Sequence, residues 1–116
     1  MGETIFSKII RKEIPAEIVF ENEQVLAFND INPQAPVHVL IIPKITEIET
    51  TRDIDPQKHA YLLGALFNAA NSIAKDFGIS ETGFRLVLNC GPDAGQEVYH
   101  LHMHLLGGRK MNWPPG

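Results

Sequence analysis

Three histidines stand at alternate positions in the segment Tyr99 to Leu106, near the end of the chain. Successive side chains of a β-strand point to opposite faces, so His100, His102 and His104 are expected to share one face. Neutral imidazole is a nucleophile near pH 7, and protonated imidazole is a general acid. The segment therefore predicts nucleophilic and acid–base chemistry on a phosphate ester or amide.

His102 is the best placed attacking group, because it alone has a histidine neighbour on each side along the strand. Its neighbours could orient it, donate to a phosphoryl oxygen as a charged group and protonate a departing amine. We expect the imidazoles to face a cleft or solvent. The intervening apolar side chains should pack under a long helix; they are Tyr99, Leu101, Met103 and Leu105.

Two other interpretations of the three histidines stay open. A solvated polar face would be expected to mix Lys, Glu and Thr rather than repeat histidine. Alternate histidines can also bind Zn²⁺, but on a strand His100 and His104 would lie about 13 Å apart at Cα. A zinc site would then need two of the histidines and ligands from elsewhere, with Cys90 and Asp93 the nearest candidates.

The segment Asn89 to Glu97 contains two glycines and leads directly into the histidine segment. Such loops can direct backbone N–H groups towards an anion. The spacing matches neither a Walker loop nor a dinucleotide-binding motif, so a plain hairpin connection is the alternative interpretation. A phosphate-binding role is indicated only by the position of the loop, immediately before His100.

The remaining elements predict an α+β domain with an antiparallel sheet. A short helix is expected over residues 7–12, stopped by Pro15. Five segments rich in β-branched and aromatic residues are expected as strands: 17–21, 24–29, 37–42, 84–89 and 99–106. A five-stranded meander with one helical layer fits the length of the chain.

The longest predicted element is a helix over residues 55–77. Asp55 can accept hydrogen bonds from the first unpaired amides, Pro56 suits the first turn, and Gly78 suits the C-terminal cap. Apolar residues recur at spacings of three and four and predict one buried stripe: Leu62, Leu63, Leu66, Phe67, Ala70, Ile73, Ala74 and Phe77.

Composition narrows the class of protein. The chain has 116 residues and a net charge of −4, which fits one domain and argues against binding to nucleic acid or to an anionic membrane. The single Cys90 cannot form an internal disulfide, as expected in the cytoplasm. The start at Met1–Thr4 lacks the pattern of a secretory signal, and the apolar run 37–43 is too short to cross a bilayer.

The sequence resembles the histidine-triad (HIT) family, and within it the Hint branch. The family pattern His-x-His-x-His followed by apolar residues corresponds to His100–Leu106. The likeness covers nearly the whole chain, with matching segments at 4–10, 26–31, 33–38, 95–99 and 106–116. It implies a single HIT domain over residues 1–116, with a five-stranded antiparallel sheet, one long helix and one short N-terminal helix.

The resemblance implies a nucleotidyl hydrolase or transferase that acts on purine nucleoside 5′-phosphoramidates, including AMP-NH₂ and AMP-lysine, and on aminoacyl-adenylates. No cofactor or metal is expected. His102 would attack the α-phosphorus and form a nucleotidyl-histidine intermediate. His104 would contact the phosphate, and His100 and His38 would complete a hydrogen-bond chain. Without the resemblance, His38 would be interpreted as a histidine satisfied within its strand.

The resemblance also assigns the nucleotide site. Asp30 and Ile31 would hold the ribose, and Asn89 with the backbone of Gly95, Gln96 and Glu97 would hold the phosphate. Three apolar residues could line the base pocket, although their types are equally those of core residues: Phe6, Ile9 and Phe28. His59 matches no catalytic position of the family and is expected at the surface.

The role of the Glu97 side chain is left open. Some Hint proteins have serine at this position, and its hydroxyl is thought to touch the phosphate or the leaving group. A carboxylate beside an anionic phosphate is repulsive unless it points away or binds a cationic or amine leaving group.

The family likeness further implies a homodimer whose sheets join, with the tail 107–116 reaching towards the partner's active site. A tryptophan in a proline-bounded tail cannot extend a helix or a central strand, so Trp113 is expected to be buried against something. A tail without function is the alternative. The other class of function left open is a Hint-like binding or regulatory module with little catalysis; the intact His38 and three triad histidines favour an enzyme.

Overall fold

The computed structural model describes residues 3–116. Met1 and Gly2 lie outside the described residues, and they belong to the segment Met1–Thr4 in which no secretory signal was expected. The elements in chain order are α1 (Ile5–Ile10), β1 (Ile18–Glu21), β2 (Val25–Asn29), β3 (Val37–Pro43), α2 (Ala60–Asp76), β4 (Phe84–Val87) and β5 (Met103–Gly107), with 3₁₀ turns at Thr51–Asp53 and Pro92–Ala94. The predicted α+β class, five-stranded antiparallel sheet and two helices are confirmed.

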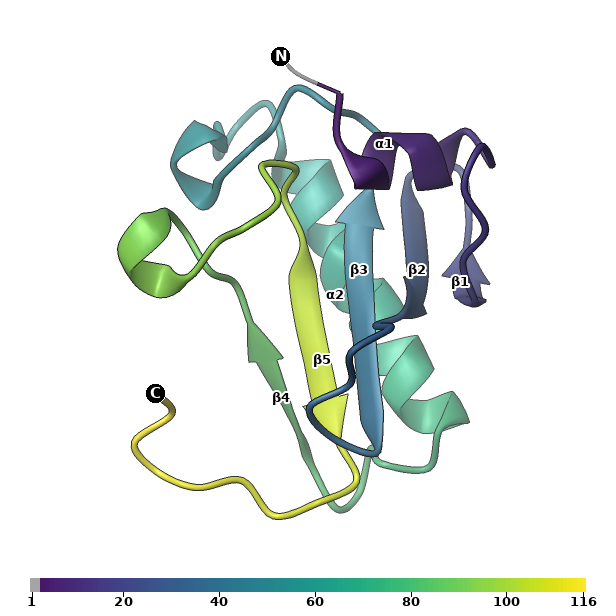
Figure 1. Cartoon of the computed structure of the whole chain (residues 1–116), viewed down its shortest axis with the longest axis vertical. Coiled ribbons are helices and arrows are strands. Elements are labelled where there is room, and N and C mark those ends of the chain that lie inside the picture. The colour runs from purple at the N-terminus through teal and green to yellow at the C-terminus, as the bar shows by residue number, and fades with distance from the viewer. Residues whose placement is uncertain (1–2) are drawn as a thin grey trace.

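The strand order is β1-β2-β3-β5-β4, so the prediction of a meander was wrong. β3 and β4 each pair antiparallel with β5 and therefore run parallel to each other. Parallel strands need a crossover connection, which α2 provides behind the sheet (Figure 1). β5 then returns into the gap between β3 and β4, and the histidine segment is thereby placed next to β3.

Both predicted helices begin at other residues than expected. α1 starts two residues earlier, because Thr4 caps it: the Thr4 hydroxyl accepts the Ser7 amide at 3.2 Å, and the Ser7 hydroxyl accepts the Thr4 amide at 2.8 Å. α2 starts at Ala60, five residues later than predicted. Asp55 does accept the amides of Gln57 and Lys58, but it caps the turn that precedes the helix.

Core side chains fill both faces of the sheet. One cluster lies between the sheet and α2, and β3 contributes Val39 and Ile41 to it. The other cluster lies under α1 and contains Leu40 and Ile42. β3 is therefore covered on both faces, which accounts for its continuous run of apolar residues.

The predicted stripe of α2 was too wide. Leu62, Leu66, Ala70, Ile73 and Ala74 are buried, and Ala69 joins them. Leu63 is half-buried, whereas Phe67 and Phe77 are 47% and 39% exposed. The helix rests on the sheet through one face only, so side chains at the margins of the stripe remain outside the core.

No helix within residues 3–116 has both the length and the apolar character needed to cross a membrane.

Candidate active site

The histidine segment is only partly a strand. β5 begins at Met103, which pairs with Ile41 of β3, and β4 ends at Val87, opposite His104. The amide of Leu101 donates instead to the carbonyl of Ile48 at 2.9 Å. The predicted strand bounds 84–89 and 99–106 were therefore too long at the ends that meet the loop.

The alternation of faces persists through the irregular part of the segment. Leu101, Met103 and Leu105 pack in the cluster beneath α2, as predicted. Tyr99 was expected to join them but is exposed, because it lies beyond the sheet, in the bend that leaves the loop.

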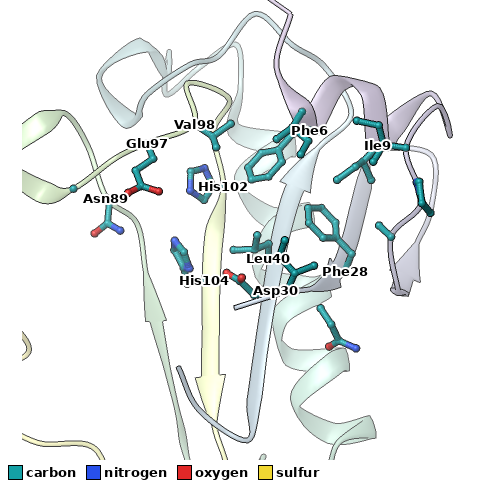
Figure 2. A pocket seen from close by; sticks show the side chains of 17 residues that line it. Phe6, Ile9, Phe28, Asp30, Leu40, Asn89, Glu97, Val98, His102 and His104 are labelled. Atoms are coloured by element: carbon teal, nitrogen blue, oxygen red, sulfur yellow. The ribbon is translucent and has the colours of Figure 1, made fainter. Parts of the chain in front are cut away.

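A pocket of about 550 Å³ opens on the histidine face, a size typical of small-molecule sites. Ten of the predicted site residues line it: Phe6, Ile9, Phe28, Asp30, Ile31, Asn89, Gly95, Glu97, His102 and His104. In Figure 2, His102 and His104 separate the polar side chains of Asn89 and Glu97 from an apolar wall that includes Phe6. The pocket thus offers an apolar surface for a flat ring beside a polar region for a charged group.

His102 is held in a single tautomer. Its Nδ1 lies 2.8 Å from the backbone carbonyl oxygen of His100. A carbonyl oxygen only accepts, so Nδ1 carries the proton and Nε2 keeps its lone pair. His102 is only 8% exposed, and Phe6 packs edge-on against its ring with ring centres 5.1 Å apart. His102 is therefore a fixed, neutral imidazole with an available lone pair.

His38 and His104 form a second chain of defined protonation. The Gln34 amide donates to His38 Nδ1 at 3.0 Å, so the proton of His38 is on Nε2. His38 Nε2 donates to His104 Nδ1 at 3.0 Å, which leaves the proton of His104 on Nε2. Asp30 Oδ2 lies 3.4 Å from His38 Nε2 and is a second acceptor. These hydrogen bonds make His104 a neutral donor through its Nε2.

The pairing of β3 with β5 explains why these two histidines meet. Leu40 lies directly opposite His104, and His38 lies two residues along β3 on the same face as Leu40. Diagonal neighbours on one face of a sheet are within reach of long side chains.

His100 does not face the pocket, contrary to the expectation that all three imidazoles would. Its side chain is buried, and its Nε2 donates to the Pro43 carbonyl at 2.9 Å. The segment before β5 turns under α1, where Phe6 also packs against the His100 ring. The His100 ring is fixed by the Pro43 carbonyl, and the His100 backbone carbonyl accepts the proton of His102 Nδ1. His100 is therefore a positioning residue.

Burial keeps the site histidines neutral. It is the main reason why the pKa values of His38, His100 and His102 are lowered. The pKa of His104 falls to about 4, first through burial and then through its neighbours His102 and His38, while Asp30 opposes the shift. The expected charged donor for a phosphoryl oxygen is therefore replaced at pH 7 by a neutral one.

Acidification is expected to destabilise the fold between pH 6.5 and about 4. An imidazole with a lowered pKa binds protons more readily in the unfolded chain. The contribution of neutral His104 to the free energy of unfolding is therefore complete above pH 6.5. It is lost as the pH falls towards the pKa of about 4 in the folded protein. Urea midpoints measured from pH 7.5 to 4 should fall, and those of His104→Gln should fall less. Equal slopes in the two proteins would contradict this account.

The loop before the histidines is held by Gln96. Its Oε1 accepts the Gly91 amide at 2.9 Å, and its Nε2 donates to the carbonyls of Glu49 and Val98. The Gln96 side chain is buried and does not line the pocket, so it shapes the loop. Gly95 has φ +81°, a left-handed conformation that glycine adopts readily, and it lines the pocket.

His59 was expected at the surface, but it is 6% exposed. It stands at the N-cap position of α2 without a side-chain capping bond. Its Nδ1 accepts the backbone amide of Asp55 at 2.9 Å, because the turn before the helix folds back over the ring. Sequence reasoning also missed Leu40 and Val98 as pocket residues. Leu40 follows His38 by two positions on one strand, a spacing that could have identified it.

Trp113 is 81% exposed and does not line the pocket of its own chain. The tail is held near β4, where Arg85 donates to the carbonyl of Asn112 at 3.1 Å.

Within residues 3–116, the side chains of Asp30, His38 and His104 are the group that could share a metal ion. Their ligand atoms all lie within 4.8 Å of one another. Cys90 and Asp93, the ligands considered from sequence, are not part of the group.

The fold and the site together define a class of protein: an α+β sheet that places paired histidines at a pocket of small-molecule size. The family model for the HIT domain matches residues 11–111, and the chain belongs to the HIT family. It is 54% identical over 113 residues to Adenylylsulfatase HINT1 of Arabidopsis thaliana, covering 97% of this chain and 76% of that protein. The predicted membership of the Hint branch is confirmed.

Two further relatives support this conclusion. The chain is 56% identical over 113 residues to the 14 kDa zinc-binding protein of Zea mays, covering 97% of this chain and 88% of that protein. The crystal structure of a HIT family hydrolase from Legionella pneumophila Philadelphia 1 matches with a TM-score of 0.95 and 51% identity, covering 98% of this chain and 100% of that one. Two of these relatives, the Arabidopsis protein and the Legionella protein, are named as hydrolases.

Proposed function

We propose that the protein hydrolyses the P–N bond of purine nucleoside 5′-phosphoramidates through a nucleotidyl-histidine intermediate. The observation that carries the proposal is the tautomer of His102, whose Nδ1 donates to the His100 carbonyl and whose Nε2 keeps its lone pair in a ring that lines the pocket. A nucleophile needs such an oriented lone pair at neutral pH.

In the first step, the Nε2 lone pair of His102 forms a bond to the α-phosphorus as the P–N bond breaks. The departing nitrogen keeps the bonding electrons and takes a proton from solvent, so the amine leaves neutral. The His102 ring becomes positively charged, and the His100 carbonyl, 2.8 Å from Nδ1, stabilises that charge. The neutral His104 donates from Nε2 to a phosphoryl oxygen.

In the second step, water attacks the phosphorus and the bond between phosphorus and His102 Nε2 breaks. The ring recovers its lone pair, the nucleoside monophosphate leaves, and one proton returns to solvent. The two steps together consume one water and release one amine. The apolar wall of Phe6, Ile9 and Phe28 suits a purine, and Asp30 and Ile31, which also line the pocket, would hold the ribose.

Incubation with adenosine 5′-phosphoramidate tests the proposal. We expect release of AMP and ammonia at an undiminished rate in the presence of EDTA, and an AMP adduct on His102 after an acid quench. Absence of turnover, with AMP still binding, would favour the alternative of a nucleotide-binding or regulatory module.

Zinc binding is a second candidate property, favoured by the Asp30–His38–His104 group and by the name of the maize relative. The nitrogen and oxygen donors suit Zn²⁺. However, His38 Nε2 and His104 Nδ1 share one proton, which a metal ion would have to replace. We therefore expect added zinc to inhibit hydrolysis, and EDTA to reverse the inhibition.

We further propose a cytoplasmic homodimer; its location is supported by the single cysteine. β4 is an edge strand, and α2 exposes Tyr61 and Phe67 beside its buried stripe. Pairing of two β4 edges would continue the sheet, and we expect it to cover Phe67. The tail carrying Trp113 would then reach towards the partner's pocket.

Sedimentation at micromolar concentration should show a species of twice 12.9 kDa, and Phe67→Glu should dissociate it. A wild-type species near 12.9 kDa would contradict the dimer.

A further inference from the structure

Glu97 lines the pocket, but its side chain takes no part in the reaction proposed above. In Figure 2 its carboxylate points towards the space between Asn89 and His102. None of the ion pairs formed within residues 3–116 involves Glu97. The pocket therefore presents a carboxylate without a positively charged neighbour.

Apart from the histidines, two ionisable residues line the pocket, Asp30 and Glu97, and both are acidic. No lysine or arginine lines it. Asp30 is engaged, since its Oδ1 accepts the Asn32 amide at 2.8 Å and its Oδ2 lies 3.4 Å from His38 Nε2. The histidines are neutral at pH 7, so nothing in the pocket compensates a second negative charge on a substrate.

The arrangement of the residues that line the pocket leaves the leaving group of a substrate beside Glu97. The apolar residues Phe6, Ile9 and Phe28 suit the base, and Asp30 and Ile31 lie on the ribose side. The phosphoryl group must lie against His102. The substituent that leaves the phosphorus then extends towards the open polar side, where Asn89 and Glu97 stand.

We propose that Glu97 selects substrates by the charge of their leaving group. This inference rests on the phosphoramidase function proposed above. A departing amine that carries a second, protonated amino group, as in a diamine or lysine-type compound, is attracted by the carboxylate. A departing amine that carries a carboxylate is repelled. Glu97 is exposed, so each effect should be modest, about three- to fivefold, and should weaken with salt.

Three AMP phosphoramidates provide the test, made with ethylenediamine, propylamine and β-alanine as cationic, neutral and anionic leaving groups. Intrinsic reactivity cancels when the ratio of kcat/KM values for the cationic and anionic substrates is compared between wild type and Glu97→Gln. We expect this ratio to fall about tenfold in Glu97→Gln at low salt, and to fall in wild type as salt is added. Glu23→Gln, at an exposed glutamate in the β1–β2 turn, should leave the ratio unchanged.

The outcomes separate the two proposals. Turnover of all three substrates with equal ratios in wild type and Glu97→Gln would overturn the role of Glu97 and leave the phosphoramidase in place. An equal loss of activity towards all three substrates in Glu97→Gln would also overturn charge selection, because it would show a structural role. Failure of wild type to cleave any of them would overturn the phosphoramidase proposal and this one with it.

Discussion

His102→Ala is expected to lower kcat/KM for adenosine phosphoramidate by about 10⁴-fold or more, the range found when an attacking side chain is removed. The lone pair on Nε2 is the group that bonds to phosphorus, and His104 already bonds His38 through its Nδ1. No other pocket residue can replace it in the same position. Steady-state kinetics and mass spectrometry of acid-quenched protein would measure the loss of turnover and of the AMP adduct together.

His59→Ala is the matched control. His59 is buried to a similar degree, and its Nδ1 also bonds to backbone, but it does not line the pocket. Both substitutions should lower the urea midpoint, because each removes a buried ring. Only His102→Ala should remove the adduct. An adduct that persists on another residue of His102→Ala would show that the attacking group has been misassigned.

The residues that carry the chemistry could be found from sequence because they depend on a local rule. Alternation along the chain places Leu101 and Met103 in the core and His102 and His104 on the other face, even where β5 has not yet begun. Thr4 and Ser7 show the same kind of local signal at the start of α1. Each of these patterns is set by neighbours within four residues.

The burial of His100 and His59 and the strand order around the site depend on contacts between distant segments, so they could not be predicted from local patterns. Nothing local in His100 indicates that its ring will reach Pro43, 57 positions earlier, instead of the pocket. The insertion of β5 between β3 and β4 likewise depends on the crossover of α2. His59 was misplaced for a similar reason, because its burial follows from the way the preceding turn folds over it.

His38 also acts through a contact with a distant segment, because it bonds to His104 on β5. His38 was recognised as a site residue only through the family resemblance, since a lone histidine on an apolar strand has no distinguishing pattern. The structure shows that it sets the proton position of His104 through one hydrogen bond of 3.0 Å. Two residues that act through one bond should not have independent effects on the reaction.

A double-mutant cycle on His38 and His104 should show this coupling. His104→Ala removes the donor to the phosphoryl oxygen and should cost at least about 10²-fold in kcat/KM. His38→Ala leaves that donor in place but no longer fixes its tautomer, so a smaller loss of about tenfold is expected. The double variant should be no less active than His104→Ala alone. Multiplying losses would contradict a shared role.

The pH profile distinguishes positioning by His38 from a purely structural effect. In wild type the acid limb of kcat/KM should lie well below pH 6.5, because the pKa values of His102 and His104 are lowered. His38→Ala removes one of the causes that lower the pKa of His104 and admits water beside it, so that pKa should rise. The neutral donor is then lost at a higher pH, and the acid limb should move towards 6.5. A variant that was only less well folded would lose activity without this shift.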